Sequence, residues 1–146
     1  MRLWHKDIIQ FLPRTQLLSQ WRELNSIYKF QNKHILINYI YEYPKIYLYA
    51  YSQIVINEMK KMGYKISSWD NYNDYFKDCI DSQLDNDYLS TLSYKEHDDT
   101  YFLICIYNLY EKGIRGQTDF PIERYNSMCD YYARNIDKSA CLIRRL

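Results

Sequence analysis

Apolar residues return every three or four positions along most of this chain, which is the period of an α-helix. The first such segment covers residues 14–29, and its apolar stripe consists of Leu17, Trp21, Leu24 and Tyr28. A second segment begins at Pro44, a residue favoured in the first turn of a helix, and ends before Gly63, which suits the left-handed position after one. Its stripe consists of Leu48, Tyr51, Val55, Met59 and Met62. The spacing predicts a helix in both segments.

Two more helices are predicted in the second half. Ser93 followed by Glu96 has the spacing of a capping box, and we expect the helix after it to stop at Gly113. A last helix is expected from about Pro121 to Ile136. The stripes are Phe102, Cys105, Ile106 and Leu109 in the first and Ile122, Tyr125, Cys129, Tyr132 and Ile136 in the second. Because three Gly and three Pro allow few turns, we expect an all-α fold, a compact bundle of three to four main helices with an extended N-terminal segment over residues 2–11.

With 146 residues the chain is long enough for one core, and we expect a single helical domain over residues 1–146. Residues 30–43 read as a connector between helices. Residues 66–92 are acidic and rich in Asn, Asp and Tyr, and they are expected to form an elaborated loop with a short helix near 72–84.

The net charge of +1 hides a division along the chain. Residues 1–65 hold ten Lys/Arg against four Asp/Glu, whereas residues 66–100 hold two against nine. A basic face that is separated from an acidic one can bind a phosphate backbone even when the total charge is near zero. Ordinary surface asymmetry explains the same counts equally well without further information.

Other classes of protein are disfavoured. No uncharged run approaches the length of a membrane span, and no signal peptide is visible. Cys79, Cys105, Cys129 and Cys141 show no C-x-x-C spacing, with Cys105 and Cys129 expected to be buried thiols, so the chain reads as intracellular, cytoplasmic or nucleoid-associated. The three His show no metal-ligand spacing, and no Gly-rich phosphate loop exists.

One carboxylate lies off the apolar stripe of the first helix. Glu23 is two residues from Trp21, which turns it about 200° around the helix axis. Its neighbours at helical spacing are polar, and two are small: Gln16, Ser19 and Ser26. Most Arg-Glu pairs on a helix, such as Arg22 and Glu23, are solvated surface. The small neighbours nevertheless leave room for another molecule to approach this acid.

The stretch L-P-R-T-Q-L-L-S-Q-W-R-E-L, residues 12–24, resembles the pyrimidine-dimer DNA glycosylases of the phage endonuclease V type. That family has Arg-Glu-Leu at the same distance from the N-terminus, preceded by an aromatic residue and a similarly spaced Leu. The resemblance covers roughly residues 2–34 and is looser through Gly63. It implies a DNA repair glycosylase with abasic-site lyase activity on damaged double-stranded DNA, without cofactor or metal, and we expect a monomer.

The resemblance also implies roles for single residues. Glu23 corresponds to the catalytic carboxylate, the N-terminal α-amine to the nucleophile, and Arg22 to a DNA contact near the lesion. Arg14 and Gln16 lie at the matching helix start but differ in type from the phage pattern. Lys33, His34 and Arg115 are further candidates for contacts with phosphates. His34 has a surface or structural role as its alternative.

An α-amine suits nucleophilic chemistry because its ordinary pKa is about 7.7–8.0, against about 10.4 for lysine. The chain departs from the family at this point. The phage enzyme loses its initiator Met before a small residue, whereas Met1 here precedes the bulky Arg2, which normally prevents removal. The aligned position is Arg2, yet the free amine is expected on Met1. The alternatives are a non-catalytic helical module that binds DNA or protein, and a helical enzyme for another damaged base.

Overall fold

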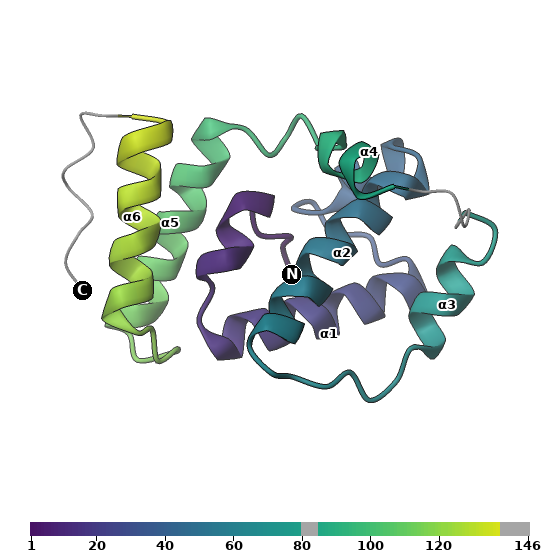
Figure 1. The fold of residues 1–146 in the computed structure, drawn as a ribbon, viewed down its shortest axis with the longest axis horizontal. Helices are drawn as coiled ribbons and strands as arrows, with labels where there is room; N and C mark the ends of the chain where they lie inside the picture. Colours follow the sequence, from purple (N-terminus) through teal and green to yellow (C-terminus); the bar gives the residue numbers. More distant parts are fainter. Residues whose placement is uncertain (80–84, 138–146) are drawn as a thin grey trace. The chain divides into compact units, whose positions relative to one another are not determined.

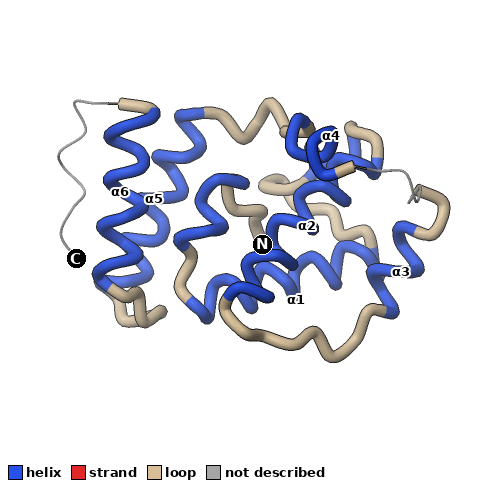
Figure 2. Tube along the Cα trace, in the orientation of Figure 1, coloured by secondary structure: helices blue, strands red, loops and turns tan. Residues whose placement is uncertain are grey.

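The computed structural model describes residues 1–79 and 85–137, and within them the chain forms only helices and loops (Figure 2). The elements in chain order are the 3-10 helix η1 (Lys6–Phe11), α1 (Arg14–Phe30), the 3-10 helix η2 (Asn38–Glu42), α2 (Lys45–Lys61), α3 (Asp70–Phe76), α4 (Asn86–Thr91), α5 (Asp99–Ile114) and α6 (Ile122–Asn135) (Figure 1). The predicted all-α class is confirmed, and the long helices of the described residues are α1, α2, α5 and α6, as expected.

The fold divides into two compact units. Unit 1 consists of Met1–Leu3 and Leu18–Glu96, and unit 2 consists of Trp4–Leu17 and His97–Leu146, of which residues 138–146 lie outside the described part. The chain end therefore belongs to the same unit as Glu23. A single domain over residues 1–146 remains a prediction.

The buried stripe of α1 differs from the predicted one by part of a turn. Leu17, Leu24 and Tyr28 are buried as expected, but Trp21 is half-exposed. Gln20 and Ile27 take its place, and both are completely buried. The reason is that Trp21 lies at the edge of the core, where its ring packs edge-on against Trp69 at 5.9 Å between centroids.

Helix α2 lies in the core of unit 1 and agrees with its predicted stripe at Leu48, Tyr51, Val55 and Met59, while Met62 is half-buried. Ser52 donates to the Leu48 carbonyl at 2.7 Å, which leaves its oxygen to accept from the Tyr28 hydroxyl. Gly63 follows the helix with φ of +81°, and the Tyr64 amide donates back to the Met59 carbonyl at 2.9 Å. These bonds are those of a left-handed helix cap.

The acidic segment 66–92, expected to be an elaborated loop, contains two short helices, α3 and α4. Helix α3 begins earlier than the predicted 72–84 helix, of which residues 80–84 lie outside the described residues. Its Tyr72 and Phe76 are buried and pack edge-on against Tyr28 of α1 at 6.0 and 5.2 Å. The tyrosines that enrich this segment therefore serve partly as core.

In unit 2, η1, α5 and α6 contact one another. Residues 2–11, expected to be extended or irregular, include the 3-10 turn η1, which buries Ile8 and Ile9. The predicted capping box is wrong: the N-cap of α5 is Asp98, whose side chain accepts from the Tyr101 amide at 2.8 Å. Glu96 instead accepts from the Tyr43 hydroxyl at 2.6 Å.

The predicted stripe of α5 is buried throughout, whereas that of α6 is buried only in its middle. Tyr125, Cys129 and Tyr132 are buried with Met128, but Ile122 is 51% exposed because it lies in the first turn. Cys105 and Cys129 are buried, as expected, and Cys79 is half-buried. Cys141 lies outside the described residues. Among the helices of residues 1–79 and 85–137, none is both long and apolar enough to cross a membrane.

Two histidines that are 92 positions apart in sequence stack inside unit 2. The rings of His5 and His97 lie 5.5 Å apart at 27°, and both side chains are buried. The His5 Nδ1 accepts from the Asp7 amide at 3.1 Å, and the His97 Nδ1 accepts from the Lys6 amide at 3.3 Å. A nitrogen that accepts carries no proton, so these bonds require neutral rings.

The stability of the protein should therefore fall in mild acid. Burial lowers the pKa of His97 to about 3, and the charges of His5 and Lys6 act in the same direction. In the unfolded chain the His97 imidazole binds a proton below about pH 6.5. In the folded state it binds one only at much lower pH. Through this residue, each pH unit below about 6.5 should lower the free energy of unfolding by about 1.4 kcal/mol.

Urea unfolding measured from pH 7 to 5 tests this expectation. His97→Gln keeps a side-chain acceptor for Lys6 and should reduce the pH dependence, while the contribution of His5, whose pKa is also lowered by burial, remains. The same slope in His97→Gln and the wild type would contradict it.

Candidate active site

A buried amide connects Glu23 with the beginning of the chain. The Gln20 Nε2 donates to the Glu23 Oε2 at 3.3 Å and to the Arg2 backbone carbonyl at 3.2 Å. The carbonyl oxygen and the carboxylate oxygen are therefore no farther apart than the sum of these two distances. Among the predicted catalytic residues, Glu23 and Arg2 are thus brought together, although they are 21 positions apart in sequence.

Gln20 is completely buried, and its polar atoms are used on both sides. The Gln20 Oε1 accepts from the Tyr51 hydroxyl of α2 at 3.0 Å, a bond that is itself buried. An amide in this position without partners would cost about 1–3 kcal/mol of stability. The three bonds offset that cost and couple α1, α2 and the chain end.

The chain end is anchored next to its first residues. Leu3 is completely buried, Arg2 is half-buried and Met1 is 36% exposed. Two residues of extended backbone span roughly 7 Å, so the Met1 amine stays within that distance of the bonded Arg2 carbonyl. The Met1 amine is therefore tethered to a carbonyl that shares the Gln20 amide with Glu23.

Arg22 lies on the exposed face of α1, beside Glu23. Its Nη2 donates to the Ser19 hydroxyl one turn earlier at 2.9 Å, which steers the guanidinium along the helix. Glu23 itself is half-buried. An exposed planar group with several donors suits phosphate contact.

The other predicted DNA contacts are spread over both units. Lys33 and His34 are exposed in unit 1, where the Lys33 ammonium lies 3.9 Å from the centroid of the Tyr41 ring and the His34 Nδ1 accepts from the Leu36 amide at 3.1 Å. Unit 2 holds Arg14, Gln16 and Arg115. Arg14 and Arg115 are exposed, Gln16 is half-buried, and Arg115 pairs with Glu111 at 3.6 Å.

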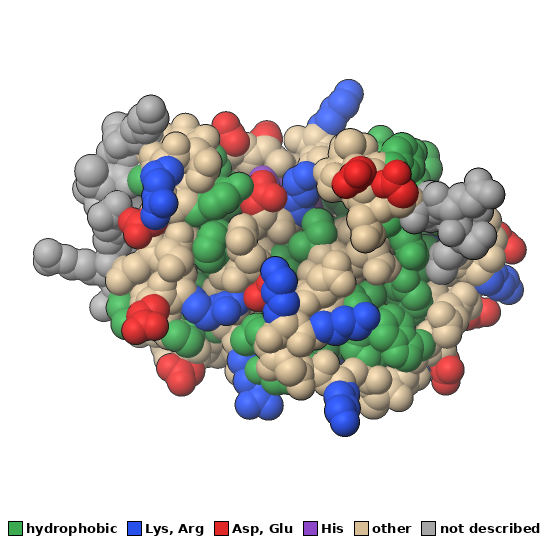
Figure 3. Space-filling model, in the orientation of Figure 1, with side chains coloured by type: hydrophobic (Ala, Val, Ile, Leu, Met, Phe, Trp, Pro, Cys, Tyr) green, Lys and Arg blue, Asp and Glu red, His purple; other side chains and the backbone are tan. Residues whose placement is uncertain are grey.

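Basic side chains emerge over the region of α1 and α2, where Lys and Arg are drawn in blue in Figure 3. His34 supports its own turn through two bonds, since its amide also donates to the Asn38 side chain at 2.7 Å. That local role agrees with the structural alternative for His34.

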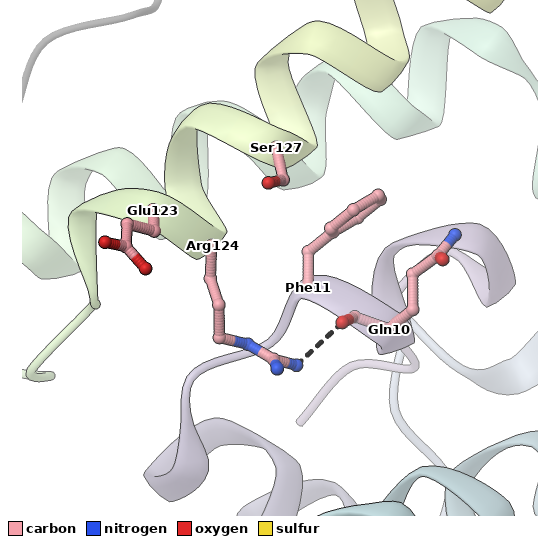
Figure 4. Close-up of a pocket in the computed structure, with 5 residues that line it drawn as sticks. All are labelled: Gln10, Phe11, Glu123, Arg124 and Ser127. Carbon is pink, nitrogen blue, oxygen red and sulfur yellow. Dashed lines mark hydrogen bonds between the residues drawn. The ribbon is translucent and has the colours of Figure 1, made fainter.

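Unit 2 contains an open cavity of about 330 Å³ between η1 and α6. It is lined by Gln10, Phe11, Glu123, Arg124 and Ser127 (Figure 4). Arg124 reaches across to donate to the Gln10 carbonyl at 2.7 Å, so its guanidinium closes part of the opening. None of the residues predicted from the sequence lines it.

The sequence did not point to Gln20 or Tyr51 as parts of a site. The available signal was the polar Gln20 within the stripe Leu17, Leu24 and Ile27, where an apolar residue is expected. A buried amide in such a stripe indicates a bonded partner from another segment. The identity of that partner depends on the tertiary fold.

The described residues thus form an all-α protein in which a half-buried acid, Glu23, shares the Gln20 amide with the Arg2 carbonyl. Residues 1–71 match the sequence model of a known family, described as pyrimidine dimer DNA glycosylase. The match confirms the predicted resemblance to pyrimidine dimer DNA glycosylases over these residues, which are slightly fewer than half of the chain. No curated protein and no solved structure matches it.

Proposed function

We propose that the protein releases a damaged base from a pyrimidine dimer in duplex DNA and then cleaves the strand at the resulting abasic site. The nucleophile is the α-amine of Met1, or of Arg2 if Met1 is removed, and Glu23 is the carboxylate. The observation that supports this most directly is the Gln20 amide, which bonds to both the Arg2 carbonyl and Glu23.

The chemistry needs a nucleophile and a carboxylate at the same sugar. As the bond from C1′ to the base breaks, positive charge develops on the sugar, and the Glu23 carboxylate stabilises it. The neutral amine forms a bond to C1′ and loses a proton, and the base leaves with the bonding electrons and takes up a proton. The C1′–O4′ bond then opens, O4′ takes up a proton and becomes a hydroxyl, and the nitrogen lone pair forms a protonated imine with C1′. This imine acidifies the C2′ proton, and removal of that proton by Glu23 expels the 3′ phosphate.

DNA binding rests on Arg22 and the basic residues of the first half, with contributions from Arg14, Gln16, Lys33, His34 and Arg115. Residues 1–65 carry a net charge of +6, and cations that neutralise phosphates release counterions from the duplex. No metal or cofactor is required by the proposed steps. The proposed active form is a monomer.

Binding to duplex DNA should weaken steeply as salt rises. Arg22→Ala should lower the affinity and reduce the slope of log K against log salt by about 1, because one phosphate contact is lost. Lys77→Ala is the matched control, since Lys77 lies in the acidic segment, exposed and paired with Asp74 at 3.7 Å. Affinity measured by fluorescence anisotropy at several salt concentrations decides this. Absence of binding even at low salt would rule out the proposed substrate.

The decisive experiment for the function is incubation of the purified protein with a duplex that carries one thymine dimer. Strand cleavage at the dimer, absent on the undamaged duplex, supports the proposal. Binding without base release would instead favour the alternative, a non-catalytic helical module that binds DNA. Release of a different damaged base would support the proposed chemistry and would change the proposed substrate.

A further inference from the structure

The Gln20 amide can point in only one direction. Its Nε2 faces two acceptors, the Arg2 carbonyl and the Glu23 carboxylate, and its Oε1 faces the Tyr51 hydroxyl. Reversal of the amide would place its oxygen against two other oxygens. The two acceptors therefore select the orientation in which both amide protons are directed at the chain end and the acid, and the Tyr51 hydroxyl of α2 meets the remaining oxygen.

The core does not require a glutamine at this position. Gln20 lies in an otherwise apolar stripe with Leu17, Leu24 and Ile27, where a leucine fills similar space without a polar group to satisfy. Because Gln20 is completely buried, its amide does not contact solvent and does not contribute to solubility. What the amide adds over leucine is a pair of directed hydrogen bonds.

We propose that Gln20 is a positioning residue, whose Nε2 holds the chain-end backbone and the Glu23 carboxylate in the relative geometry needed for attack at the sugar. This proposal rests on the proposed function. Gln20 touches neither the substrate nor the reacting atoms. It acts through the Arg2 carbonyl, one residue from the Met1 amine, and through the Glu23 Oε2.

The double variant Gln20→Leu with Tyr51→Phe tests the proposal. It removes the amide and the hydroxyl together, so no buried polar group on either side chain is left without its partner. The matched control is Tyr51→Phe alone, which keeps both Nε2 bonds. Gln20→Asn is a second test that retains the amide but is one methylene too short to reach both acceptors.

On a dimer-containing duplex the double variant should lose roughly tenfold to a hundredfold in kcat, because misplacement of about 1 Å costs that much. Its KM and its Tm should stay near the wild-type values, and Tyr51→Phe should retain most of the turnover. Gln20→Asn should show the same loss in kcat, which keeps the test open if the double variant does not fold. Unchanged turnover, or a loss that follows the loss of folded protein, would overturn the proposal.

Backbone 15N relaxation of Arg2 gives a readout that needs no enzymatic activity. Arg2 should be ordered in the wild type and in Tyr51→Phe, and mobile on the nanosecond timescale in the double variant. An Arg2 that is equally ordered in all three proteins would refute the positioning role. A wild type that does not cleave DNA, with Arg2 mobile only in the double variant, would refute the proposed function and leave the Gln20 contact established.

Discussion

Glu23→Gln is expected to abolish cleavage of dimer-containing DNA while leaving the fold and DNA binding largely intact. The side chain is half-buried and off the apolar stripe, so the substitution creates no cavity. The amide oxygen of the new side chain can still accept from the Gln20 Nε2, which preserves the local bond. What disappears is the negative charge that stabilises the sugar cation and takes the C2′ proton. Such acid–base assistance contributes about 10²–10⁴ in rate.

The measurement is single-turnover cleavage, with Tm and DNA affinity recorded on the same preparations. Glu42→Gln is the matched control, because it removes the same charge from an exposed position of η2 in unit 1. Its activity should equal that of the wild type. Equal cleavage by the wild type and Glu23→Gln would show that Glu23 is ordinary surface and would return the Arg22-Glu23 pair to that simpler interpretation.

Borohydride should trap the protein covalently on dimer-containing DNA, with the sugar attached to the α-amine of residue 1 or 2. Reduction converts the imine at C1′ into a stable amine, and peptide mapping then locates the linkage. The Met1 amine stays within roughly 7 Å of the Arg2 carbonyl that Gln20 binds. Because Met1 is 36% exposed, DNA can reach the amine without unfolding of the chain end.

Acetylation of the N-terminus, or its extension by further residues, should eliminate the trapped species, since the amine becomes an amide without nucleophilicity. The folded state should remain, because Leu3 and the core are unchanged. Linkage to Lys6 or Lys33 would keep the lyase reaction and exclude the chain end as nucleophile. Base release without a trapped species would make water the nucleophile, with Glu23 as its base.

The Met1-Arg2 start departs from the phage pattern, in which a small residue follows the initiator Met. Retention of Met1 moves the amine one residue, about 3.5 Å, beyond the aligned position of Arg2. The anchoring bond is made by a backbone carbonyl, so it does not depend on the side chain of residue 2. A backbone bond of this kind can form with Arg2 as well as with the small residue of the phage enzyme.

Most helices followed from local pattern alone. The stripes at 14–29, 44–62 and 102–109 have the helical period, and burial of one face requires no knowledge of the partner. Gly63 ended α2 as expected because a left-handed position favours glycine whatever surrounds it. The Arg22-Glu23-Leu24 motif also indicated the resemblance from sequence alone, because a short motif within one helix can be recognised without knowledge of the tertiary structure.

The tertiary structure decided the rest, because it depends on which segments meet. Glu96 accepts from the hydroxyl of Tyr43, a residue 53 positions away. His5 and His97 stack although nothing in their spacing connects them. The contact of Gln20 with Arg2 and Tyr51 joins three separate segments of chain. The sequence shows an unexplained polar residue in an apolar stripe, and only the packing of α2 and the chain end against α1 determines what that residue binds.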